Sequence, residues 1–181
     1  MIVRPAEASD MAALAEIYGH HVLHGFGTFE EVPPSGDELN QRREAIVARG
    51  LPYLLAEDQG KALGFAYAGP FRLRAAYRYT LEDSVYVAPD AQGRGVGRAV
   101  LSGVIAACEA IGIRQMVAVI GDSGNAGSIG LHTALGFTHR GSGLGLGFKH
   151  GRWVDIVWMQ KALNGGAGRE PDAPGLALSG V

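Results

Sequence analysis

The spacing of apolar residues predicts two helices in the first third of the chain. The first carries its apolar residues three and four positions apart, on one face: Met11, Leu14, Ile17, Tyr18 and Val22. Ser9 or Asp10 is its expected N-cap. Ser35 and Glu38 form a Ser-x-x-Glu capping box, which predicts a second, more polar helix that ends at Gly50.

Short segments along the rest of the chain have the composition of strands. They cover residues 2–4, 53–57, 63–68, 80–87, 115–120, 137–140 and 153–160. The second and third flank the turn Asp58-Gln59-Gly60-Lys61 and are expected to form an antiparallel hairpin. Two further helices are predicted over 96–111 and 125–135. This order of elements predicts a fold of the α/β (α+β) class, with a mixed sheet and helices on its faces.

The end of the chain differs in composition from the rest. We expect one domain over residues 1–163, followed by a Gly/Pro-rich segment over 164–181. Such a segment buries too little surface to offset the entropy lost on ordering, which predicts a flexible tail without a catalytic part. The alternative is a small docking segment at Leu176-Ala177-Leu178.

Composition and charge narrow the classes of function. The 181 residues are 47% hydrophobic and 19% charged, which suits a single compact domain. The net charge of -2 leaves no excess of cations, so we expect neither a nucleic-acid nor a membrane partner. Cys108 is the single cysteine and cannot form an internal disulfide. Because the first residues also lack the pattern of a signal peptide, we expect a cytoplasmic protein.

Glycine is the outlier of the composition, with 28 residues, and one glycine-rich loop stands between a strand and a helix. Its residues are Gln92, Gly93, Arg94, Gly95, Val96, Gly97 and Arg98. Free N–H groups and the helix dipole make such a loop an anion cradle, most suited to a pyrophosphate. The spacing fits neither a nucleoside-triphosphate loop nor a dinucleotide fingerprint. A tight turn that only permits close helix packing is the alternative.

Two blocks of sequence resemble the GNAT superfamily of N-acetyltransferases. The motifs are Gln92-x-x-Gly95-x-Gly97, like the acyl-CoA pyrophosphate loop, and Asn125-x-x-x-x-x-x-His132-x-x-Leu135-Gly136-Phe137. Within the superfamily, the chain is most similar to phosphinothricin and methionine sulfoximine/sulfone acetyltransferases. That similarity lies in Thr80-Leu81-Glu82-Asp83-Ser84-Val85-Tyr86-Val87, Val117-Ala118-Val119-Ile120 and Lys149-His150-Gly151-x-Trp153-x-Asp155. It covers Met1 to about Lys161.

The resemblance implies the GNAT fold, with a mostly antiparallel mixed sheet of about seven strands and helices on both faces. It also implies acetyl-CoA as cosubstrate. The residues expected to hold acetyl-CoA are the glycine-rich loop 92–98 together with Val85, Tyr86, Val87, Asn125 and Ser128. By resemblance, the backbone of Val85 to Val87 pairs with the pantetheine arm and the Val87 N–H polarises the thioester carbonyl. From the sequence alone, Val85 and Val87 are core valines.

Acetyl transfer to an amine needs a base, and Glu82 is the best placed carboxylate. Residues 82, 84 and 86 share one face of the strand, so the rival Asp83 points the other way. The resemblance favours Glu82, because the base of the subfamily lies in the Thr-x-Glu segment before the Val-Tyr-Val strand. A solvated carboxylate at the start of a strand is the alternative.

Asn125, Ser128 and His132 fall on one face of the helix over 125–135 and can face one ligand. The wider superfamily often has Tyr at the position of His132, and that Tyr is given the role of protonating the leaving thiolate. His132 could take that role, assist Glu82 as a base, or be a buried structural histidine. Asn125 is expected to hold the pantetheine amide by resemblance, and it is also suited to cap the helix.

The acceptor pocket is predicted from a cluster before the Glu82 strand. Arg72, Arg74, Tyr77 and Arg78 crowd this loop, and a guanidinium fork suits the carboxylate of an amino-acid-like acceptor. The alternative is a solvated arginine cluster. Phe29 lies in the loop that closes over the acceptor in the resembled subfamily, or is a core anchor.

Two further features concern assembly and metals. Trp153 and Trp158 in the last strands are expected in the core or at a subunit interface, since similar GNAT proteins commonly dimerise through late strands; we expect a homodimer. His20 and His24 could pair on a metal, but no third ligand is evident, so no metal site is expected.

Taken together, these residues predict an acetyl-CoA-dependent N-acetyltransferase. Its expected acceptor is the amine of a small amino-acid-like molecule of the phosphinothricin, methionine sulfoximine or sulfone type, which attacks directly in a ternary complex. One alternative is an enzyme that modifies peptide, protein or other amines. Another is a non-catalytic acyl-CoA-binding sensor.

Overall fold

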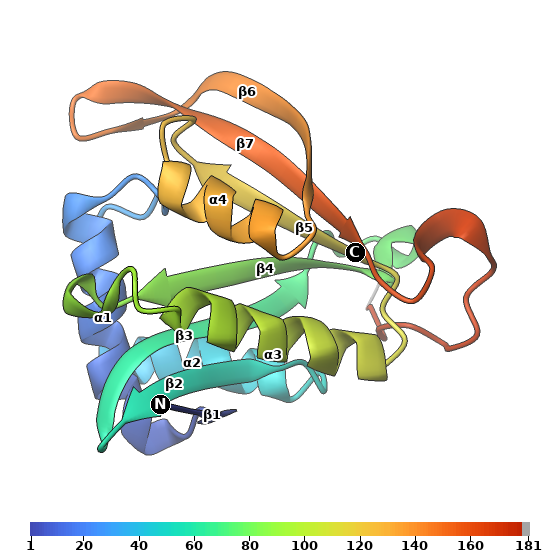
Figure 1. Cartoon of the computed structure of the whole chain (residues 1–181), viewed down its shortest axis with the longest axis horizontal. Helices are drawn as coiled ribbons and strands as arrows, with labels where there is room; N and C mark the ends of the chain where they lie inside the picture. The colour runs from blue at the N-terminus through green and yellow to red at the C-terminus, as the bar shows by residue number, and fades with distance from the viewer. Residues whose placement is uncertain (179–181) are drawn as a thin grey trace.

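The computed structural model describes residues 1–178, which form one seven-stranded sheet with helices on both faces (Figure 1). The strands are β1 (Ile2–Pro5), β2 (Tyr53–Asp58), β3 (Lys61–Pro70), β4 (Thr80–Val87), β5 (Gln115–Gly121), β6 (Thr138–Lys149) and β7 (Arg152–Ala162). Their order is β1-β2-β3-β4-β5-β7-β6, and β4 and β5 form the parallel pair within an otherwise antiparallel sheet. The predicted fold class and order of elements are confirmed.

Four α-helices cover the sheet, two on each face (Figure 1). They are α1 (Met11–His24), α2 (Gly36–Val47), α3 (Val96–Ala110) and α4 (Ala126–Ala134). Short 3-10 turns occupy Ala8–Asp10, Ala75–Tyr77, Pro89–Ala91 and Gly166–Gly168. Neighbouring residues of β4 point to opposite layers: the Tyr86 ring packs edge-on against Tyr18 of α1, while Val87 lies against Gly97 of α3.

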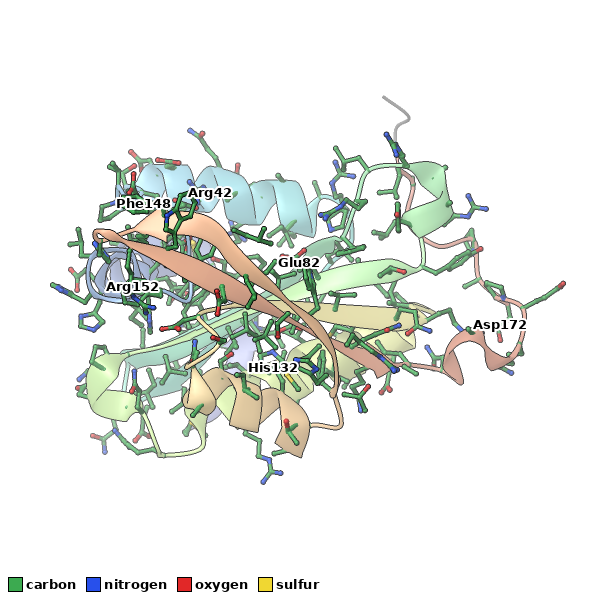
Figure 2. The ribbon with its side chains drawn as sticks, turned by 90° about the horizontal axis from the view of Figure 1, so that it is seen from above. Arg42, Glu82, His132, Phe148, Arg152 and Asp172 are labelled. Atoms are coloured by element: carbon green, nitrogen blue, oxygen red, sulfur yellow. The ribbon has the colours of Figure 1, made fainter. Side chains whose placement is uncertain are left out.

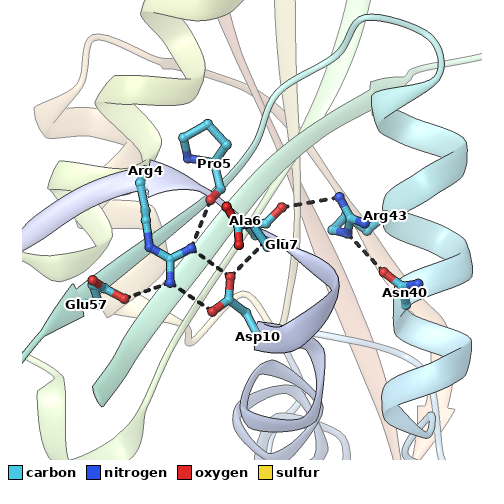
Figure 3. A network of polar contacts seen from close by, with 8 residues as sticks. All are labelled: Arg4, Pro5, Ala6, Glu7, Asp10, Asn40, Arg43 and Glu57. Carbon is cyan, nitrogen blue, oxygen red and sulfur yellow. Dashed lines mark hydrogen bonds and ion pairs between the residues drawn. The ribbon is translucent and has the colours of Figure 1, made fainter. Parts of the chain in front are cut away.

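The first helices begin as predicted, but their polar side chains bond differently. Asp10 stands at the N-cap of α1, where its carboxylate accepts hydrogen bonds from Arg4 and from Glu7 N instead of capping the helix (Figure 3). Ser35 caps α2 by accepting from Glu38 N at 3.1 Å. The Glu38 side chain does not complete the capping box, because it accepts from Arg42 one turn later.

An ion-pair network ties the first strand to its neighbours (Figure 3). Arg4 donates to both carboxylate oxygens of Asp10 at 2.8 Å and to Glu57 of β2 at 2.7 Å. On α2, Arg43 donates to the carbonyl of Ala6 at 3.2 Å. The Arg4 hydrogen bonds are the main reason that the pKa of Asp10 is lowered. The network therefore joins β1, β2, α1 and α2 on the edge of the sheet away from β5.

A buried lysine fixes the loop between α1 and α2. Lys149, at the end of β6, is 1% exposed, and its Nζ donates to the carbonyls of Gly25 at 2.9 Å and Thr28 at 2.8 Å. The Phe29 ring packs on Gly147 of β6, where any Cβ would collide with it. The glycine at this position of β6 thus makes room for the loop.

The segment after β7 follows the domain surface as far as the structure describes it. The buried Arg114 donates to the carbonyl of Gly166 at 2.7 Å and to that of Arg169 at 3.0 Å. Tyr79 donates its hydroxyl to Ala173 O, and Leu176 N donates to Arg78 O. Leu176 packs against the hydrophobic core, and the docking alternative stays a prediction. The mobility of the segment stays a prediction, and residues 179–181 lie outside the described part.

No helix in the described part of the chain, residues 1–178, is both long enough and apolar enough to cross a membrane.

Candidate active site

A cleft of about 740 Å³ opens where β4 and β5 separate. The parallel pairing runs from Thr80 with Gln115 to Asp83 with Ala118, and beyond that point the strands diverge. The ends of both strands, the glycine-rich loop, the start of α4 and Gly25 to Gly27 line the cleft. The sheet thus splits at its parallel pair and leaves a slot for a ligand.

The glycine-rich loop has the geometry of an anion cradle. Gly93 and Gly95 have φ values of +71° and +79°, and a Cβ added at either would meet no other atom within 4 Å. Gly95 is the N-cap of α3, and the first helical hydrogen bond runs from Ala99 N to Gly95 O. The preceding N–H groups are therefore left for an anion at the positive end of the helix dipole.

The backbone of β4 offers hydrogen-bonding groups to the cleft. Ala88 N donates to Leu63 O of β3. In an antiparallel pair every second residue bonds to the neighbouring strand, so Tyr86 and Ser84 of β4 also bond to β3. The N–H and C=O groups of Val85 and Val87 therefore face the side from which β5 has separated. A pantetheine arm requires such free groups along an extended backbone. The Tyr86 ring lies on the α1 side of the sheet, so Tyr86 lines the cleft with its backbone atoms.

His21 of α1 holds one of these backbone groups. Its Nε2 lies 2.9 Å from Val87 O, and because a carbonyl only accepts, Nε2 carries the hydrogen. Burial lowers the pKa of His21, which favours the neutral ring. This contact fixes the peptide after Val87 while the N–H of Val87 stays open to the cleft. His21 was not predicted at the site, because its position in the helix gives no signal for this contact.

The helix α4 and its N-cap residue place Asn125, Ser128 and His132 on the cleft, as predicted. Asn125 caps the helix by accepting from Ser128 N at 3.1 Å, and its Nδ2 lies 3.4 Å from Gly121 O. The capping role expected of Asn125 is confirmed. Its proposed contact with the pantetheine amide stays a prediction.

His132 pairs with Asp83, a contact that sequence reasoning missed. The two side chains are 2% and 1% exposed, and His132 Nε2 lies 3.0 Å from Asp83 Oδ2. Asp83 points away from the face of Glu82, as expected, and meets α4 on the other side. His132 is thus placed with Asp83 and not with Glu82, so a direct proton exchange between His132 and Glu82 has no support in this geometry.

Glu82 lies on the opposite side of β4, toward α2, while His132 lies on α4 (Figure 2). Burial raises the pKa of Glu82, and the charge of Asp83 adds to this effect. The positive charge of Arg72 acts in the opposite direction and lowers the pKa. A half-buried carboxylate with a raised pKa binds a proton more tightly than an exposed one, as a general base requires.

The family of the chain follows from this geometry together with its matches to known proteins. Residues 18–137 match the acetyltransferase (GNAT) family. The chain belongs to the GNAT acetyltransferase family. A phosphinothricin N-acetyltransferase of Alcaligenes faecalis is 53% identical over 164 residues, which cover 91% of this chain and 83% of that protein.

Two further relatives of this GNAT chain are acetyltransferases that are similar over most of its length. An L-methionine sulfoximine/L-methionine sulfone acetyltransferase of Salmonella typhimurium is 41% identical over 173 residues, or 96% of this chain and 99% of that protein. The crystal structure of a phosphinothricin acetyltransferase from Sinorhizobium meliloti in complex with acetyl-CoA superposes with a TM-score of 0.91. That protein is 46% identical in sequence, and the match covers 94% of this chain and 92% of the other. The expected family, fold and class of enzyme are confirmed.

Within residues 1–178, none of the residues expected to bind the acceptor is among those that line the cleft of this GNAT domain. Four of them are exposed: Arg72, Arg74, Tyr77 and Arg78. The charge of Arg72 lowers the pKa of Glu82. Arg78 bonds locally to Ala75 O, and its own carbonyl holds Leu176, which links it to the segment after β7. Phe29 is 40% exposed. Their contacts with an acceptor stay predictions.

Proposed function

We propose that this GNAT enzyme transfers the acetyl group of acetyl-CoA to the amine of a small amino-acid-like acceptor of the phosphinothricin, methionine sulfoximine or methionine sulfone type. The observation that carries the proposal is the split between β4 and β5, which opens onto an anion cradle at Gly93 and Gly95. The acceptor class is supported by the relatives named above, which act on these compounds.

Each step of the reaction has a residue suited to it. Glu82 takes the proton of the amine, because burial raises the pKa of its carboxyl toward the working range of a base. The open N–H of Val87 stabilises the charge that develops on the thioester oxygen. The N–H groups of residues 92–98 hold the pyrophosphate. Transfer is direct, since both substrates reach the same split in the sheet from different sides.

The carboxylate of the acceptor is assigned to the arginines before β4. The charge of Arg72 lowers the pKa of Glu82, which supports a guanidinium and the base that serve the same acceptor. An amino acid presents its carboxylate and its amine one carbon apart, which suits this arrangement. Arg74 and Tyr77 complete the expected contacts from the same exposed loop.

We also propose that the enzyme is a homodimer built on β6 and β7. An apolar patch on these strands is strongly exposed: Leu144 (79%), Leu146 (58%), Phe148 (59%) and Trp153 (66%). β6 is an edge strand, and exposed apolar edge strands are usually covered by a partner. In Figure 2, Phe148 lies at the end of the molecule opposite Asp172, so the segment after β7 leaves this patch open. Trp158 is partly buried and contributes less.

The first test is thiol release from acetyl-CoA with a panel of acceptors. The panel holds phosphinothricin, methionine sulfoximine, methionine sulfone and free amino acids, with a polyamine and a lysine peptide as contrasts. We expect turnover with the first three. Turnover confined to the lysine peptide or the polyamine would support the alternative of a broader amine modifier. Binding of acetyl-CoA without turnover on any amine would support a sensor.

The location of the protein and its other partners are also proposed from the sequence. A cytoplasmic location, and the lack of a nucleic-acid or membrane partner, stay predictions. Fractionation of cells that express the chain tests the first, and a DNA-binding and a vesicle-binding assay test the second.

A further inference from the structure

Arg114 joins three parts of the chain that lie far apart in sequence. Its backbone N–H donates to Tyr79 O at 3.0 Å, and its carbonyl accepts from Leu163 N, directly after β7. Its guanidinium is 3% exposed and donates to three carbonyls of the C-terminal segment (residues 164–178): those of Gly166, Arg169 and Glu170. Within residues 1–178, all side-chain hydrogen bonds of Arg114 go to this segment. Because a buried guanidinium needs acceptors, Arg114 and the segment depend on each other.

The C-terminal segment also binds the arginine loop, which is the connection between β3 and β4 (residues 71–79) (Figure 1). The hydroxyl of Tyr79 donates to Ala173 O at 2.9 Å, and Leu176 N donates to Arg78 O at 2.9 Å. The side chain of Leu176 packs against the hydrophobic core. The segment is therefore fixed to the domain by its leucine and to the last two residues of the loop by two hydrogen bonds.

The arginine loop has few other contacts with the domain. Residues 72–78 are all exposed. From Phe71 to Tyr77, the hydrogen bonds in the described part of the chain are local: Phe71 N donates to Thr80 O at 3.4 Å, and Tyr77 N donates to Arg74 O at 2.9 Å. An exposed loop with local hydrogen bonds opens easily unless its ends are fixed. The C-terminal segment binds at one of these ends.

The arginine loop closes the β3–β4 hairpin beside Glu82. The last pairs of the two strands are Gly69 with Glu82 and Pro70 with Leu81, so Glu82 is one pair away from the end of the hairpin. The positive charge of Arg72, in the loop, lowers the pKa of Glu82. Within residues 1–178, the lining of the cleft includes neither the arginine loop nor the C-terminal segment. A displacement of the loop should therefore affect the acceptor and not acetyl-CoA.

We propose that the C-terminal segment positions the acceptor, because it holds the arginine loop where its arginines meet the acceptor's carboxylate. Tyr79 and Leu176 are the positioning residues: the first anchors the loop through its hydroxyl, and the second anchors the segment in the core. This inference rests on the proposed function, which assigns the carboxylate to these arginines. A segment that only stabilised the domain would change folding, whereas a positioning segment changes the KM for the acceptor and leaves kcat and the KM for acetyl-CoA unchanged.

The first test uses the free enzyme and needs no acceptor. The exposed arginines of the loop are trypsin sites, so limited digestion followed by mass spectrometry measures how often the loop opens. Leu176→Asp puts a charge in place of the core contact and should raise the initial cleavage rate in the loop at least about fivefold. Ala177→Asp is the matched control, since it adds the same charge at the exposed neighbouring position, and it should be digested like the wild type.

Cleavage at Arg49 shows whether the change is confined to the loop. Arg49 is exposed in the turn after α2, and its cleavage rate should be the same in Leu176→Asp and in the wild type. An equal rise at Arg49 and in the loop would overturn the proposal, because the segment would then stabilise the whole domain and not the loop. Unchanged cleavage in the loop would overturn it as well.

The second test measures kinetics with the acceptor that the panel identifies. The KM for the acceptor should rise about tenfold in Leu176→Asp and about threefold in Tyr79→Phe, which loses the hydroxyl bond to Ala173 O. In both variants, kcat and the KM for acetyl-CoA should stay within about twofold of the wild type. Leu176→Met keeps an apolar side chain of similar volume and should keep the wild-type KM for the acceptor.

The outcomes separate this proposal from the proposed function. An unchanged KM for the acceptor in Leu176→Asp and Tyr79→Phe would overturn the positioning role, while thiol release by the wild type would leave the proposed function standing. A wild type that releases no thiol with any amine would remove the proposed function and the positioning role with it. If Leu176→Asp fails to fold, Tyr79→Phe, which removes one hydroxyl, supplies both measurements.

Discussion

Glu82 and Asp83 are neighbours on β4, yet their carboxylates face opposite layers of the sheet. Asp83 is bonded to His132 of α4, whereas Glu82 lies on the other side of the strand, toward α2. The split between β4 and β5 begins directly after them. One strand therefore presents two acidic groups to opposite faces of the sheet beside the same opening.

If Glu82 is the base, its replacement by glutamine should lower the turnover number. Glu82→Gln should lower kcat about 100-fold or more, since the amide cannot take a proton, and leave the affinity for acetyl-CoA nearly unchanged. Steady-state kinetics and calorimetry measure the two quantities. Unchanged turnover would remove Glu82 from the mechanism.

The pH dependence of the wild type follows from the same carboxylate. Glu82 acts as a base only when deprotonated, and burial raises its pKa. As the pH is lowered, kcat/KM should therefore begin to fall at a higher pH than the ordinary pKa of a glutamate would give. A pH profile of kcat/KM measures this acid limb, and the limb should be absent in the residual activity of Glu82→Gln. A limb that persists there would have to arise from another group.

The cradle predicts that Gly95 is needed for cofactor binding. Gly95→Val should weaken acetyl-CoA binding at least about tenfold, because the valine side chain would fill the space of the phosphates and strain a φ of +79°. Gly60→Val is the matched control, since Gly60 has a φ of +78° and open space in the distant β2–β3 turn. The control variant should lose stability but keep its affinity for acetyl-CoA. Equal affinities in the two variants would discredit the cradle.

The buried ammonium of Lys149 predicts a link between stability and the acceptor loop. Lys149→Met should lower the free energy of unfolding by about 2–4 kcal/mol, because the carbonyls of Gly25 and Thr28 lose their donor. The KM for the acceptor should rise as well. Chemical denaturation and kinetics measure these effects. Lys61→Met, at an exposed lysine, is the control and should change stability by less than about 0.5 kcal/mol.

The apolar patch of Leu144, Leu146, Phe148 and Trp153 predicts a dimer that one charge can disrupt. Light scattering should give twice the chain mass for the wild type and the chain mass for Leu146→Glu. Leu23→Glu, on the exposed face of α1, should leave the dimer intact. A monomeric wild type at micromolar concentration would contradict the proposed interface.

The order of elements and the cradle could be predicted from sequence because both are local. The apolar spacing of α1 and the glycines from 93 to 97 lie within single stretches of chain, and the structure places them as predicted. Period two along β4 also predicted that Asp83 points away from Glu82. The two late strands were predicted too short, since glycines at 141, 143, 145 and 147 hide the strand pattern of β6.

The contacts that complete the site join distant stretches, and no local pattern reports them. Asp83 and His132 are 49 residues apart, and the contact depends on how α4 lies relative to the middle of β4. Lys149 and Thr28 are 121 residues apart, and a lysine at the end of a strand is typical of an exposed position. Arg114, which holds the segment after β7, is missed for the same reason. In each case tertiary packing decides which polar group a side chain meets.

The most direct test of the account is a single-turnover experiment with acetyl-CoA bound to excess wild-type enzyme and phosphinothricin, methionine sulfoximine or methionine sulfone as the acceptor. Released thiol and the acetylated acceptor, identified by mass spectrometry, are followed together. The account predicts that both form at the same rate and in equal amounts. Bound acetyl-CoA that stays intact with all three acceptors, or thiol released without an acetylated amine, would contradict it.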